Sequence, residues 1–185
     1  MGLKPSRKLG AGANTKGFNR YPVADAYGTA LFKGDPVKLS AGFIQIAAAD
    51  EAPLGIFMGC SYVDANGTPL LKPYLPASTT STAAPIDSVN GTTNAVAYVL
   101  DDADITMTIS ADAALSTVNM GQYFNMNVVA GSTTSGDSGY TLDVATGSAT
   151  SVHTLMLVGL VDEPGNELTD STPKVEVKWA QHVDK

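Results

Sequence analysis

The stretch Ile105-Thr106-Met107-Thr108-Ile109 alternates strictly between apolar and polar side chains. Successive side chains of a β-strand point to opposite faces of a sheet, so this alternation predicts a strand with one buried face. The stretch Val175-Glu176-Val177-Lys178-Trp179 repeats the pattern later in the sequence. Since few windows show helical periodicity, we expect the protein to be built mainly from β-sheets.

Short apolar runs separated by turn-forming residues occupy most of the remaining sequence, a spacing typical of small sandwiches and barrels. The pair Asn66-Gly67 predicts a hairpin turn, because both residues tolerate positive φ. Pro69 and Pro73 place the returning strand at a sheet edge, since proline cannot donate to a ladder. One or two helical turns are expected at residues 112–118. Further strands are predicted at residues 28–32, 37–39, 43–46, 54–63, 68–74, 95–100, 123–129 and 152–161.

These elements predict a mainly β fold with very little helix: a compact β-barrel or β-tulip, or a sandwich. Residues 1–20 are rich in glycine and lack any periodic pattern, so we expect an extended N-terminal arm. Residues 21–185 form the β domain. A loop rich in Ser, Thr, Ala and Pro at residues 76–94 divides it, which leaves open one sheet system or two sub-lobes, 21–75 and 95–185.

Charge is distributed unevenly along this chain of 185 residues and net charge −7. Only 16% of its residues are charged, against about 25% in an average domain. The first 20 residues contain no acidic residue, and the rest contains six basic and 18 acidic residues. An acidic body disfavours nucleic acid as a partner. A basic arm favours docking on an acidic protein surface, with these candidate contact residues: Lys4, Arg7, Lys8, Lys16 and Arg20.

The sequence offers little for chemistry, and we expect neither an enzyme nor a cofactor. Cys60 lies in an apolar run, so we expect a small buried hydrophobe. One cysteine with His153 and His182 far apart does not make a zinc site, and we predict no metal. No segment approaches the ~20 apolar residues of a membrane span, so no membrane is expected as a partner. Tyr74 and Trp179, together with Tyr123, are candidate subunit-interface residues, although strand aromatics can also stack on sugars.

Several stretches resemble the small capsid decoration (cement) proteins of tailed bacteriophages. They are Gly34-Asp35-Pro36-Val37-Lys38-Leu39, then Phe43-Ile44-Gln45-Ile46, and then Pro53-Leu54-Gly55-Ile56-Phe57-Met58-Gly59. The stretch Leu157-Val158-Gly159-Leu160-Val161-Asp162-Glu163-Pro164-Gly165-Asn166 is similar to structural proteins of marine phages. The resemblance implies a compact β fold, often a barrel or tulip, that sits on the outer capsid, commonly as a trimer.

From this resemblance we expect a structural virion protein that binds the outer capsid surface and stabilises the mature shell by bridging coat subunits. Its expected partners are the major capsid protein and further copies of itself in a homotrimer. It would be assembled in the host cytoplasm and located in the virion. Two alternatives stay open: a surface module that binds glycans or receptors, and a tail or head-completion component.

Overall fold

The computed structural model describes residues 2–8, 17–80, 95–150 and 152–183. About half of the chain is strand (49%) and 2% is helix, which confirms the predicted mainly β fold with very little helix. One 3-10 helix, Thr117–Asn119, is present in the described part, where it overlaps the end of the region 112–118 that was expected to form helical turns. None of the helices in these ranges is long and apolar enough to cross a membrane.

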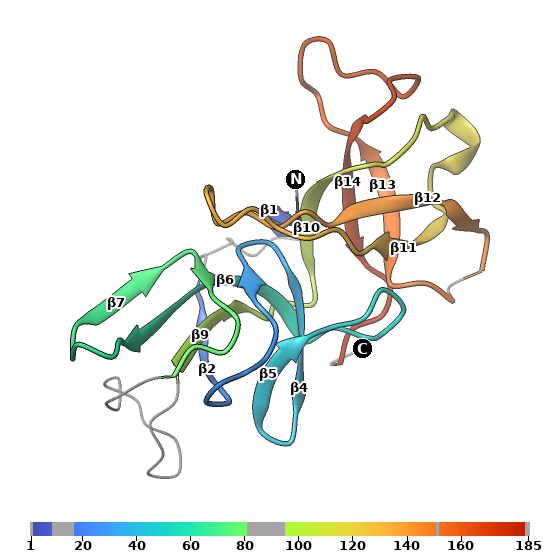
Figure 1. The fold of residues 1–185 in the computed structure, drawn as a ribbon. Helices are drawn as coiled ribbons and strands as arrows, with labels where there is room; N and C mark the ends of the chain where they lie inside the picture. The colour runs from blue at the N-terminus through green and yellow to red at the C-terminus, as the bar shows by residue number, and fades with distance from the viewer. Residues whose placement is uncertain (1, 9–16, 81–94, 151, 184–185) are drawn as a thin grey trace.

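The first sheet has six antiparallel strands, and Figure 1 shows it on the right of the molecule. Both alternating stretches of the sequence are neighbouring strands of this sheet, with Met107 opposite Val177. The side chains of Ile105 and Ile109 point into the core, and Thr106 is also buried. In spatial order the strands are β1 (Lys4–Lys8), β10 (Ile105–Ser110), β14 (Lys174–Trp179), β13 (Leu155–Leu160), β11 (Tyr123–Asn127) and β12 (Thr141–Ser148).

The second sheet curls so that its two outer strands approach within 8 Å between Cα atoms. In spatial order its strands are β2 (Asn19–Val23), β9 (Ala95–Leu100), β6 (Gly55–Val63), β4 (Pro36–Ser40) and β5 (Phe43–Ile46). β7 (Pro69–Lys72) pairs with the end of β6, as the hairpin signal predicted, and β3 (Leu31–Phe32) pairs with β8 (Tyr74–Leu75). Among the described strands no sheet closes into a barrel, and the open sheets are consistent with a β-sandwich.

The molecule has two hydrophobic cores. The first takes most of its residues from the first sheet but also includes Ile56 and Leu100 from the second sheet, and Ile46 packs against both cores. The sheets do not follow the alternative of two sub-lobes, 21–75 and 95–185. Strand β9 lies in the second sheet between β2 and β6, while β1 joins the first sheet. Strand pairing therefore links the two halves of the chain.

The N-terminal segment, predicted as an extended arm, joins both sheets in its described residues, 2–8 and 17–20. Strand β1 pairs antiparallel with β10, and the side chain of Leu3 is only 1% exposed within the first core. Residues 19–20 belong to β2. The apolar side chain of Leu3 and the open edge of β10 together account for this docking, because burying both removes apolar surface and unpaired backbone groups from water.

Candidate functional site: a cationic apolar groove

A groove lies on the second sheet where strand β6 is irregular. The pairing of β6 with β9 shifts register between Phe57 and Gly59. Gly59 has φ 152°, and a Cβ atom there would lie 3.0 Å from the carbonyl oxygen of Lys72. Because glycine has no side chain, the backbone at Gly59 forms an open floor, and a larger residue would be strained there.

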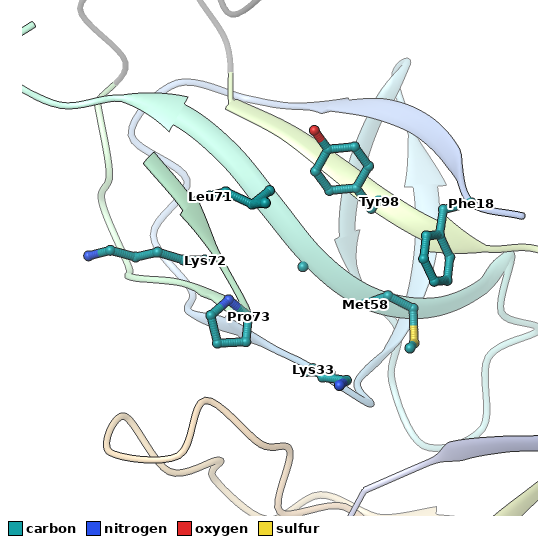
Figure 2. Close-up of a pocket in the computed structure, with 8 residues that line it drawn as sticks. Phe18, Lys33, Met58, Leu71, Lys72, Pro73 and Tyr98 are labelled. Atoms are coloured by element: carbon teal, nitrogen blue, oxygen red, sulfur yellow. The ribbon is translucent and has the colours of Figure 1, made fainter. Parts of the chain in front are cut away.

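Apolar side chains from separate segments surround this floor, as Figure 2 shows. Phe18 comes directly before β2, Met58 lies on β6 and Tyr98 lies on β9. Leu71 lies on the edge strand β7, and Pro73 directly follows that strand. Phe18 is 44% exposed and Leu71 is 75% exposed. The groove has a volume of about 500 Å³, and an adjoining hollow of about 270 Å³ shares Phe18 and Met58 with it.

The groove carries an excess of positive charge although the chain as a whole is acidic. Lys33 lines both the groove and the adjoining hollow, and Lys4 and Asp137 also line the hollow. Lys72 is part of the groove wall, but Figure 2 shows its side chain pointing away from Phe18, Met58 and Tyr98. A hydrogen bond to Tyr62 raises the pKa of Lys72, and its ammonium lies 5.9 Å from the centroid of the Tyr62 ring. The Lys72 ammonium therefore lies at the Tyr62 ring, and Lys33 and Lys4 supply the positive charge of the groove and its hollow. The surface suits an acidic partner that also offers apolar side chains.

The ring of Tyr98 holds a further cation, Arg20, beside the groove. The guanidinium carbon of Arg20 lies 5.9 Å from the centroid of the Tyr98 ring, within the range of a cation–π contact. The hydroxyl of Tyr98 is hydrogen-bonded to Ser61 Oγ at 3.1 Å, which holds the ring in place. This contact positions Arg20 at the groove without covering Leu71 on β7.

The backbone around Lys33 is fixed by a buried junction between the two sheets. The amide of Lys33 donates to Gly136 O at 2.9 Å, and Gly34 O accepts from the amide of Leu3 at 3.1 Å. The Asp35 carboxylate is 1% exposed and accepts hydrogen bonds from Phe32 N at 2.8 Å and from the side chain of Ser138. Burial raises the pKa of Asp35, and these two hydrogen bonds oppose the rise.

The structure separates the predicted arm residues. Lys4 lies at the groove's adjoining hollow and Arg20 lies beside Tyr98. Arg7 instead pairs with Glu176 within the first sheet, at 2.8 Å between Nη2 and Oε2. Lys8 ends strand β1, and Lys16 lies outside the described residues. Two of the five cations therefore lie next to the groove, and a third is engaged in an internal ion pair.

The three aromatic interface candidates have different environments. Trp179 is 1% exposed in the first core, so it does not reach a surface where a second subunit would contact it. Tyr74 stacks on Phe32 with ring centroids 5.7 Å apart, and Tyr123 is half-buried on β11. The alternation that ends at Trp179 is the reason for its burial, since that position falls on the core face of β14.

The groups considered for chemistry are largely buried. Cys60 is buried in the second core, as predicted, and burial raises the pKa of its thiol to about 12. His182 is buried and His153 is half-buried. In the part of the chain that the structure describes, no group of three His, Cys, Asp or Glu residues is placed to hold a metal ion.

Sequence reasoning missed the residues that form the walls of the groove. Phe18 lies in the segment assigned to the arm, Met58 in an apolar run and Leu71 between two prolines. No local pattern shows that these positions converge. The one available signal was Leu71, a large apolar residue on a strand expected at an edge.

Comparisons with known proteins found no match to this chain, whether among family models, curated proteins or solved structures.

Proposed function

We propose that this chain is a non-enzymatic structural protein of a virus particle, which binds the outer capsid surface and stabilises the mature shell by bridging coat subunits. The observation that supports this role is the groove. It combines exposed Phe18 and Leu71 with Lys33, and with Lys4 in the adjoining hollow, on an otherwise acidic β protein. Exposed apolar side chains rimmed by charge are typical of protein-docking surfaces.

Such a protein stabilises a shell by binding one state of it better than another. A clamp with higher affinity for the mature shell shifts the equilibrium toward that shell. Many copies around each particle would reinforce one another, because each bound copy raises the effective concentration of its neighbours' contacts. We propose the major capsid protein and further copies of this chain, as a homotrimer, for these contacts.

The direct test is the copy number of this chain in purified particles, measured by quantitative mass spectrometry against the major coat protein. A ratio near one to one, or one trimer per threefold position, supports the decoration role. A handful of copies per particle would favour a tail or head-completion component instead. Absence from the particles would contradict any virion role.

A pair of matched variants tests whether the groove is the docking surface. Leu71→Asp adds a charge to the groove, and Val118→Asp makes the same kind of change on the 3-10 helix, where Val118 is also 75% exposed. Both variants should fold, because exposed surface changes usually alter stability by less than about 0.5 kcal/mol. We expect Leu71→Asp alone to reduce retention on purified particles in a pelleting assay. Equal retention of both variants would exclude the groove.

The aromatic side chains in the groove also favour a second candidate, a module that binds glycans on a virion or cell surface. Phe18 and Tyr98 both line the groove and could stack on a sugar ring. A glycan array compares wild-type protein with Tyr98→Ala. Binding that is lost in Tyr98→Ala would support this candidate, and an array without binding would reject it.

A further inference from the structure

We propose that the groove receives an acidic loop from a second copy of this chain. The acidic loop consists of residues 161–173 and connects β13 to β14. This inference rests on the proposed docking role of the groove and names its occupant. Both surfaces are present in one chain, so their chemistry can be compared directly.

The acidic loop is held in one shape by its own hydrogen bonds. The Asn166 side chain donates to Val161 O at 2.8 Å and to Lys174 O at 2.9 Å, and its oxygen accepts from Lys174 N at 2.8 Å. At its far side Leu168 O accepts from Leu115 N at 2.7 Å. A preformed loop loses little conformational entropy when it binds, which favours association.

The charge of the acidic loop is complementary to the charge of the groove. The acidic loop contains four carboxylates and no basic residue: Asp162, Glu163, Glu167 and Asp170. Two of these carboxylates have partners within the chain: Glu163 pairs with Lys174 at the base of the loop, and the Asp170 carboxylate accepts from Glu167 N at 2.8 Å. The residues Asp162 and Glu167 are exposed. The groove and its adjoining hollow offer the cations Lys4 and Lys33 against Asp137.

The exposed tip of the loop also matches the apolar character of the groove. Pro164 and Gly165 form the exposed turn between Glu163 and Asn166, with φ 78° at Gly165. A proline ring is a compact apolar group that Phe18 and Leu71 can cover, while carboxylates on either side face the lysines. The contact would thus pair apolar with apolar surface and negative with positive charge.

The loop cannot occupy the groove of its own molecule. In Figure 1 the loop projects beyond the ends of β13 and β14, whereas β7, which forms one wall of the groove, lies at the opposite side of the molecule. The contact must therefore run head to tail between copies. Such heterologous contacts close into rings when the rotation allows it and otherwise extend into chains.

A single loop-in-groove contact is small, so we expect weak association in solution. Interfaces below about 1,200 Å² belong to the weak, transient class. On a shell the same contact would recur between neighbouring copies and gain from avidity. Association should also weaken as salt rises from about 0.15 M to about 1 M, because exposed charges are screened within about 8 Å and 3 Å respectively.

Charge reversal on each side, and on both sides together, tests the contact. Sedimentation equilibrium over a wide range of protein concentration measures the association constant of the full chain. The groove variant is Lys4→Glu with Lys33→Glu, and the loop variant is Asp162→Lys with Glu167→Lys. Asp50→Lys, in an exposed turn, is the control for reversing an acidic residue outside the loop. We expect each double variant to lose association at least about tenfold, and the control to retain it.

The combined fourfold variant separates a direct contact from general charge effects. It has an acidic groove and a basic loop, so it should regain association if the two surfaces meet. Failure to regain it, or wild-type protein that stays monomeric at every concentration, would overturn the inference.

Retention on particles distinguishes this inference from the proposed function. If the groove variant loses particle binding while the loop variant keeps it, and neither changes self-association, the occupant is an acidic segment of another virion protein. That outcome rejects the second copy as occupant and leaves the capsid role standing. Absence of wild-type protein from particles, with association intact, would reject the capsid role and keep the contact.

Discussion

The turn at residues 33–35 belongs to two regions with opposite properties. On one side lies the junction, where Gly34 O accepts from the amide of Leu3 and Ser138 O accepts from the amide of Gly2. On the other side lies the groove, to which the Lys33 side chain contributes. The junction is buried and its polar groups have partners inside the chain, whereas the groove exposes apolar side chains and cations. We infer that the junction maintains the fold and leaves the groove free for binding.

The largest effect should come from removing the apolar side chain at the junction. Leu3→Ala deletes a fully buried group that connects β1 to the first core. Such a deletion costs about 2–5 kcal/mol, through lost transfer free energy and the cavity left behind. Urea denaturation measures the change in the free energy of unfolding. A change below about 1 kcal/mol would mean that residues 2–8 dock only loosely.

A smaller loss should follow from adding a methyl group to the junction turn. Gly34 has φ 97°, and a Cβ atom there would lie 2.9 Å from the backbone oxygen of Leu3. Gly42 has φ 85° with nothing within 4 Å of such an atom, so Gly42→Ala measures the backbone strain alone. We expect Gly34→Ala to lower the free energy of unfolding by about 1–3 kcal/mol and by more than Gly42→Ala. Equal losses of unfolding free energy in the two variants would show that the backbone of Leu3 moves away from the added methyl group without a further cost.

The junction and the groove also differ in what the sequence could reveal. Strict alternation at residues 105–109 and 175–179 identified two central strands, because the burial of a strand face follows the local pattern. Strand β12 was missed, since Thr141–Ser148 is rich in small and polar residues that resemble a loop. Strand β1 was missed because its stability depends on Thr108, far away in the sequence. The groove was missed for the same reason, because its walls come from segments that lie far apart in the sequence.

Asp35 provides a test of the junction through pH. Burial raises its pKa above the ordinary 3.8, so the folded protein keeps this proton to a higher pH than the unfolded chain does. The contribution of Asp35 to stability is therefore greatest below about pH 3.8 and falls as pH rises through the raised pKa. Asp35→Asn keeps an acceptor for Phe32 N but does not titrate, so it should remove this fall.

Urea denaturation across that pH range measures the free energy of unfolding of wild type and of Asp35→Asn. The difference between the two free energies separates the contribution of Asp35 from that of the other carboxylates. Asp50→Asn, in an exposed turn, is the matched control for the same amide substitution at another position. A difference that is flat with pH would contradict a raised pKa at Asp35.

The smallest effect on stability should come from Lys33, directly before Gly34 in the sequence. Its amide is part of the junction, but its exposed side chain contributes only to the groove. Lys33→Ala should therefore leave the free energy of unfolding within about 0.5 kcal/mol of wild type. It should still lower self-association in sedimentation equilibrium, because it removes a cation that faces the acidic loop. If Lys33→Ala destabilised the fold as much as Gly34→Ala does, the side chain would serve the junction, and the separation of folding from binding at this turn would fail.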